Sequence, residues 1–167
     1  MTPAQIAKLT VELKTDPLAL GYATALPDAG GANSARLNAM STTLTKTRFV
    51  TARTILAECD GGGSLLKALE RAAIPPTAAT AQQIEVSAAT ESALKFLNQD
   101  SGLDAGNPGT IYLINVLTAI ALLTPAQGAA LKQLAVTPAS RAEVLGIGPV
   151  ASSDITAALF NDNGSAK

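Results

Sequence analysis

The stretch TIYLINVLTAIALL, residues 110–123, decides the fold that we expect for this chain. When it is wound as a helix, its large aliphatic side chains cover almost the whole circumference, and only Asn115 and Thr118 form a narrow polar stripe. A helix that is apolar on nearly every side is buried, and this one is shorter than the about 20 residues that cross a bilayer. We therefore predict a buried central helix, with Ile114, Leu117 and Ile120 in the core.

Weaker helical patterns lie on both sides of this stretch. The tetrapeptide Thr-Pro-Ala-Gln occurs at residues 2–5 and again at 124–127, and it is a strong helix start: Thr as N-cap, Pro in the first turn and Gln three residues after the cap. Thr51 is a further candidate cap, and Thr137-Pro138 predicts a short helix that ends at Gly146.

These patterns together predict the fold class and the domain organisation. Residues 41–47, STTLTKT, are rich in β-branched threonine and are expected to be extended, but no strand-rich region is found. We expect an all-α fold, a compact bundle of seven to nine short helices around the central apolar helix at about 110–123. It forms a single helical domain over residues 1–160, followed by a flexible C-terminal tail at 161–167.

The composition limits the kind of partner that the chain can have. Its 167 residues are 47% hydrophobic and only 15% charged, where an average soluble domain is about 25% charged. The low charge suggests that part of the surface meets other protein. A net charge of −1 gives no global attraction to nucleic acid or anionic lipid, and 3% aromatic residues leave few stacking platforms for single strands.

The side chains that most enzymes use are scarce. There is no histidine, which excludes a Ser-His-Asp triad and a histidine-based zinc site. Cys59 lies between Glu58 and Asp60, which disfavour a thiolate, so we expect a buried structural thiol. The DGGGS run at residues 60–64 lacks the Gly-Lys-Ser/Thr ending of a nucleotide-binding loop and is expected to connect two helices. We expect no enzyme, no cofactor and no metal.

Four basic residues, Arg36, Lys46, Arg48 and Arg53, form a run without an intervening acid. Such a run can contact a phosphate backbone or an acidic partner. It can equally be a solvated face that acids elsewhere in the fold balance, and the net acidic charge of the chain favours this second interpretation.

Two segments near the chain ends carry a family resemblance. LKTDPLALGY at residues 13–22 follows a Thr-Pro-Ala-Gln helix start, and SRAEVLGIG at residues 140–148 is followed by Val150, Asp154 and Ala158. Together they resemble small, uncharacterised proteins encoded among the virion structural genes of tailed bacteriophages, and Asn107-Pro108-Gly109 is also similar. The chain departs from that pattern at Ala19-Leu20, where many relatives have Gly-Arg, and at Pro149, where an Arg is usual.

The resemblance implies a virion component and no activity. We expect a non-enzymatic structural protein, a multi-copy adaptor in the tail or its distal end that binds other virion proteins and copies of itself. A small-molecule substrate, nucleic acid and a membrane are not expected as partners. Without a visible signal peptide and with a single cysteine, synthesis is expected in the host bacterial cytoplasm. The alternatives are a capsid-decorating or head–tail neck protein, and a helical DNA-binding or regulatory module that uses the basic run.

Candidate contact residues are apolar and basic side chains in the loop at 20–31, in the stretch 46–53 and at the start of the tail. They are Leu20, Tyr22, Leu26, Lys46, Arg48, Phe49, Arg53 and Phe160. The candidate structural residues are Asp16, Pro17, Gly21, Ile114, Leu117, Ile120, Arg141 and Gly146. We expect Asp16, Pro17 and Gly21 to fix a turn. Arg141 is expected to pair with an acid such as Asp16, which would tie the two family-like segments together.

Overall fold

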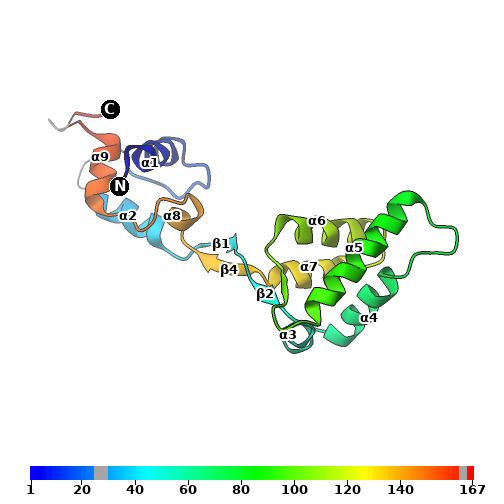
Figure 1. The fold of residues 1–167 in the computed structure, drawn as a ribbon. Helices are drawn as coiled ribbons and strands as arrows, with labels where there is room; N and C mark the ends of the chain where they lie inside the picture. Colours follow the sequence, from blue (N-terminus) through cyan, green and yellow to red (C-terminus); the bar gives the residue numbers. More distant parts are fainter. Residues whose placement is uncertain (25–29, 162–164) are drawn as a thin grey trace. The chain divides into compact units, whose positions relative to one another are not determined.

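A computed structural model describes residues 1–24, 30–161 and 165–167, and over these residues it contains nine α-helices and four short β-strands (Figure 1). The prediction of a mostly helical protein is confirmed, but the all-α class is wrong because the strands form two two-stranded sheets. Residue contacts divide the chain into two compact units. Unit 1 comprises Met1–Leu44 with Thr137–Lys167, and unit 2 comprises Thr45–Val136. Unit 2 is thus inserted between the two segments of unit 1.

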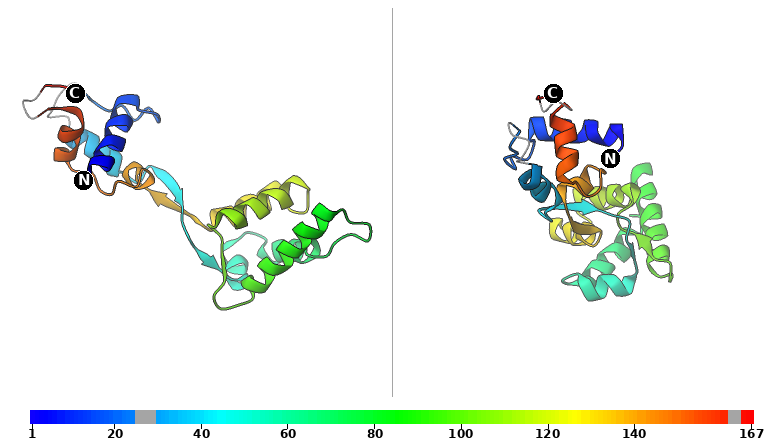
Figure 2. Two further views of the ribbon diagram at one scale, coloured as in Figure 1. Left: turned by 45° about the horizontal axis from the view of Figure 1, so that its top comes forward. Right: turned by 90° about the vertical axis from the view of Figure 1, so that its left-hand side faces the viewer.

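Among the described residues, unit 1 contains four helices from the two ends of the chain. They are α1 (Pro3–Thr15), α2 (Gly30–Asn38), α8 (Arg141–Val144) and α9 (Ser152–Leu159). Helix α9 packs against both α1 and α2 (Figure 2). The core of the unit is a cluster of buried apolar side chains that includes Leu9, Leu13, Leu37, Ile155 and Leu159. Segments that are far apart in the sequence therefore share one core.

Unit 2 is formed by one continuous segment. Its elements are β2 (Phe49–Val50), α3 (Ala52–Glu58), α4 (Gly62–Ala72), α5 (Ala81–Leu97), β3 (Leu103–Asp104), α6 (Pro108–Ala119) and α7 (Pro125–Gln133). Helix α6, the predicted central helix, packs against α5 and α7, and α4 packs against α3 and α5 (Figure 1). A separate cluster of buried side chains, including Ile55, Leu65 and Leu117, forms the core of this unit.

The paired strands β1 (Thr42–Thr45) and β4 (Val136–Ala139) contain the two positions where the chain passes between the units. The extended prediction for residues 41–47 is confirmed here, whereas the helix predicted from Thr137-Pro138 is wrong. Pro138 lies in a strand that has a single neighbour, where a missing N–H is tolerated. The helix begins instead after Ser140, whose side chain accepts a hydrogen bond from the Glu143 amide.

Three other helix starts follow the sequence signals. Thr2, Thr51 and Thr124 each accept a hydrogen bond from the amide three residues on, and each helix has the reciprocal bond of a capping box. These predictions are confirmed because capping is local. The interaction partners lie within three residues of one another, so the pattern is readable without the tertiary fold.

The central helix is less enclosed than predicted. Ile114 and Leu117 are buried, but Ile120 is 45% exposed and Tyr112 is 69% exposed. Helix α6 ends at Ala119, so Ile120 lies at its C-cap rather than inside it. Helix α6 packs mainly against α5 and α7, and these contacts leave Tyr112 and Ile120 exposed.

The sequence also predicted a single domain over residues 1–160. The structure has two clusters of buried side chains, one in each unit. The number of cooperative folding units stays a prediction that an unfolding experiment can test. Within the described residues, no helix combines the length and the apolar character that spanning a bilayer requires.

Candidate contact surfaces

A groove with a volume of about 470 Å³ lies between α5 and α6 in unit 2. On α5, the lining residues recur every three or four positions, so they follow one face of the helix. They are Gln82, Glu85, Val86, Ala89, Ser92, Ala93 and Phe96. The α6 wall includes Tyr112, Leu113 and Val116. Two aromatic rings thus lie on the groove, and both are largely exposed: Phe96 is 49% exposed and Tyr112 is 69% exposed.

A smaller hollow of about 110 Å³ extends this apolar surface. It is lined by Ile74, Ile120 and Leu122, which are 72%, 45% and 42% exposed, and by Val86. Val86 lines the groove as well, so the two depressions adjoin. Single exposed apolar side chains are ordinary, but a contiguous set is typical of a surface that binds protein. We call the groove residues and this hollow together the α5/α6 face.

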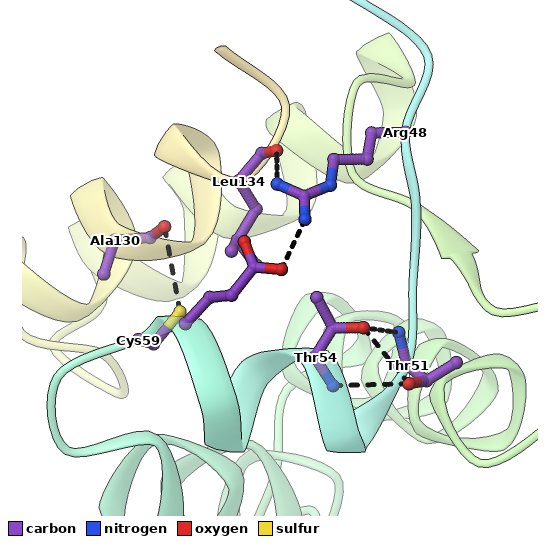
Figure 3. A network of polar contacts seen from close by, with 7 residues as sticks. Arg48, Thr51, Thr54, Cys59, Ala130 and Leu134 are labelled. Carbon is purple, nitrogen blue, oxygen red and sulfur yellow. Dashed lines mark hydrogen bonds and ion pairs between the residues drawn. The ribbon is translucent and has the colours of Figure 1, made fainter. Parts of the chain in front are cut away.

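The stretch at 46–53 contains one structural arginine, Arg48, and exposed side chains on both sides of it. Arg48 donates to the Leu134 carbonyl at 2.8 Å and to Glu58 at 2.5 Å (Figure 3). Its backbone amide donates to Asp104. These bonds tie the residue to the rest of unit 2. Phe49, next in the chain, is 64% exposed, and Arg53 on α3 is also exposed.

The four basic residues of the predicted run are divided between the two units. Arg36 lies in unit 1 and donates to the Gly21 carbonyl, while Lys46, Arg48 and Arg53 belong to unit 2. Lys46 is exposed. Arg36 and Arg48 are thus used within the fold, as the second interpretation of the run expected.

A buried ion pair joins the two segments of unit 1. Arg141 donates from Nε to Glu12 Oε1 at 2.8 Å and from Nη2 to Oε2 at 2.7 Å. The Glu12 side chain is 3% exposed and that of Arg141 is 17% exposed. The Tyr22 hydroxyl donates to Glu12 Oε1 at 3.3 Å. The prediction that Arg141 ties the chain ends together is confirmed, but the partner is Glu12 and not Asp16.

The pKa values of this cluster follow from its geometry. Partial burial, followed by the negative charge of Glu12, raises the pKa of Tyr22 far above its usual value. The hydrogen bonds to Glu12 raise the pKa of Arg141. Tyr22, a candidate contact residue, is therefore a half-buried part of an internal network, and its hydroxyl stays protonated across the physiological range.

Asp16 has another role in the turn that follows α1. It adopts a left-handed conformation with φ 41°, and its carboxylate accepts hydrogen bonds from the amides of Leu20 and Gly21, each at 2.7 Å. Gly21 has φ 74°, a conformation that favours glycine. Pro17 lies between them, as expected for a residue that fixes a turn. Leu20 is half-buried.

The remaining candidates lie at the chain end and in the loop. Phe160 is 5% exposed and belongs to the core of unit 1, so it is a core residue and not a surface contact. In the predicted flexible tail, the Asn161 amide donates to Ser165 and the Lys167 amide donates to Leu159. Gly146, with φ 66°, follows α8. Leu26 lies outside the described residues.

Cys59 is buried, and burial followed by the charges of Glu58 and Asp60 raises the pKa of its thiol. Its sulfur lies 4.0 Å from the Ala130 carbonyl (Figure 3). The expectation of a buried thiol is confirmed. In the part of the chain that the structure describes, no three histidine, cysteine, aspartate or glutamate residues come together as a metal site would require.

Two buried or bridging asparagines were missed by sequence reasoning. The Asn33 side chain bonds to both the amide and the carbonyl of Ala23, and that of Asn38 does the same with Val150. Each asparagine side chain thus donates to the carbonyl and accepts from the amide of one residue, as a residue of a neighbouring strand does. Polar residues near the ends of a short helix gave no signal for partners as distant as Val150.

Comparison of the chain with models of protein families, with curated proteins and with solved structures gave no match.

Proposed function

We propose that this chain is a non-enzymatic structural component of a tailed-phage virion, a multi-copy adaptor in the tail or its distal end. The observation that carries the contact role is the α5/α6 face, where Phe96, Tyr112 and Ile120 are exposed beside a groove of about 470 Å³. The assignment to a virion rests on the family resemblance of the two end segments.

The way the chain uses its charged groups supports a contact role. Arg141 pairs with Glu12, and Arg48 pairs with Glu58 and donates to the Leu134 carbonyl, so both arginines act within the fold. Aromatic side chains on a concave apolar surface supply binding energy without chemistry, because burying them removes apolar area from water. A protein that works by being bound needs no reactive group on that surface.

Quantitative mass spectrometry of purified particles tests the virion assignment. We expect the chain in a copy number that is a small multiple of three or six relative to the tail components. Hundreds of copies per particle would favour the capsid-decorating alternative, and absence from purified particles would overturn the proposal.

A matched pair of variants tests the contact surface. Tyr112 and Met40 are both 69% exposed, and Tyr112 lies on the groove while Met40 lies in unit 1. Tyr112→Asp should reduce incorporation into particles by about tenfold, because a charge in an apolar interface costs on the order of 1.4 kcal/mol or more. Met40→Asp should leave incorporation unchanged. Equal incorporation of both variants would contradict a binding role for the groove.

A further inference from the structure

The β2–β3 pair places an aromatic side chain on the opposite side from the groove. In this antiparallel pair, Phe49 is opposite Asp104, and Val50 is opposite Leu103. Successive residues of a strand point to opposite faces, and directly paired residues share a face. Val50 is buried in the core and Leu103 lines the groove. Phe49 therefore projects from the other face of the two strands.

Phe49 has a cation and a second apolar group near it in the sequence. Arg53 lies in the first turn of α3, and Leu56 follows three residues later on the same side of the helix. Phe49 is 64% exposed and Leu56 is 57% exposed. Arg53 makes no ion pair with another residue in the described ranges. We call these three residues the β2/α3 protrusion.

The groove has the complementary character. Its walls carry the rings of Phe96 and Tyr112, with which another aromatic ring can pack. Glu85 is the single charged residue among those that line it, and it forms no ion pair within the described part of the chain. The protrusion therefore offers an aromatic ring with a cation, and the groove offers aromatic walls with an acid.

We propose that the α5/α6 groove of one copy binds the β2/α3 protrusion of a second copy, with Phe49 between the aromatic walls and Arg53 opposite Glu85. The inference builds on the proposed contact role and names its partner. Because the protrusion and the groove are different surfaces of one chain, the contact is heterologous. Each copy keeps one free protrusion or groove after binding, so the contact propagates into a closed ring or a filament.

Complementation of two association-deficient variants tests this arrangement. Light scattering after size-exclusion chromatography should show concentration-dependent growth of the wild-type chain beyond its 16.8 kDa monomer. Phe49→Ser removes the aromatic ring of the protrusion. Ala89→Arg fills the groove from an exposed position with a good helix former. Each variant alone should remain a monomer, and an equimolar mixture should form a dimer, because one intact protrusion meets one intact groove. Met40→Ser, which replaces an exposed residue of unit 1, is the control and should associate normally.

A charge exchange tests the predicted pair. Arg53→Glu and Glu85→Arg should each weaken association by about tenfold, since each puts like charges opposite one another. The double variant, which carries both exchanges in one chain, should recover most of the loss. Circular dichroism should be unchanged for all variants, because the replaced side chains are exposed.

Three outcomes would overturn the inference. They are a wild-type chain that stays monomeric at the highest attainable concentration, a Phe49→Ser variant that still associates alone, and a mixture of the two variants that forms no dimer. The particle experiment above is independent of these. A chain that is found in particles but is monomeric in solution would keep the proposed function and reject self-docking.

Discussion

The two units are stabilised by different kinds of interaction. In unit 1, polar side chains join segments that are distant in the sequence: the buried Glu12 pairs with Arg141, and Asn38 bonds to the backbone of Val150. In unit 2, apolar helices pack around one core, and backbone segments approach closely at glycines such as Gly102 and Gly106. In unit 1, directional polar pairs fix one arrangement of the two chain ends. In unit 2, apolar packing leaves part of the apolar surface exposed and available for contacts.

The two units also differ in which side chains are needed for folding and which are available for binding. The exposed apolar side chains of the α5/α6 face, such as Phe96 and Ile120, form no hydrogen bonds with buried polar groups. Unit 2 can therefore use that face for binding. In unit 1 the polar side chains are needed for stability, because removal of one member of a buried pair leaves the other without its partner.

Replacement of Arg141 by Ala should have the largest effect. It leaves the Glu12 carboxylate, 3% exposed, without its bidentate partner, and breaking a buried pair in this way costs roughly 3–5 kcal/mol. Chemical denaturation should show the loss, and hydrogen exchange should confine it to unit 1. Arg53→Ala, which removes an exposed cation, should change stability by less than about 0.5 kcal/mol. A double exchange of Glu12 and Arg141 for Leu should be more stable than Arg141→Ala. An unchanged unfolding curve for Arg141→Ala would contradict the structural role of the pair.

Gly106→Ala should destabilise unit 2 by roughly 2–3 kcal/mol. A Cβ at this position would lie 2.0 Å from the Lys46 carbonyl oxygen, so two backbone segments would have to separate. Hydrogen exchange should report the loss in unit 2 and leave unit 1 protected. Gly63→Ala, where the nearest atom is a Leu56 methyl at 3.9 Å, is the matched control and should be neutral or better. Equal stability of the two variants would reject the close approach at Gly106.

Tyr22→Phe should cost about 1 kcal/mol near neutral pH, the usual contribution of one hydrogen bond. Its sharper signature is the pH dependence. The pKa of Tyr22 is raised in the folded state. At a pH above the ordinary tyrosine value near 10 but below the folded value, the unfolded state therefore holds fewer protons than the native state. Stability that is present below about pH 10 is lost as the pH rises above it. Unfolding curves from pH 8 to 11 should converge for wild type and Tyr22→Phe, and parallel curves would contradict a raised pKa.

The sequence predicted local features well and distant ones poorly. The capping boxes at Thr2, Thr51 and Thr124 involve residues three apart, and all three are present. Arg141 was expected to link the chain ends, but several acids could have served, and its choice of Glu12 depends on where α1 and α8 lie in the fold. A Thr-Pro pair also has two meanings. At residues 124–125 it starts a helix, and at 137–138 it lies in a strand with a free edge.

The candidate site was harder to predict than the fold. Phe49 and Arg53 were named from the sequence, and the structure places both at exposed positions of unit 2. The α5/α6 groove was missed because its α5 wall is built largely from alanines and polar residues, which give no strong apolar stripe. Its α6 wall was hidden by the opposite problem. A helix that is apolar on nearly every side does not reveal which side its neighbours leave open.

Ile120 is where that ambiguity can be measured. The sequence pattern treats it as equivalent to Ile114, because both belong to the same apolar run, yet Ile114 is 6% exposed and Ile120 is 45% exposed. Truncation of the buried residue, Ile114→Ala, should cost about 2–5 kcal/mol through lost contacts and a cavity. Ile120→Ala should cost about 1 kcal/mol or less, because much of the side chain is already in water. If denaturation gave equal losses for the two variants, Ile120 would be as enclosed as Ile114, and the hollow beside it would be closed. A small loss for Ile120→Ala together with weaker incorporation into particles would place this residue among those that serve binding and not folding.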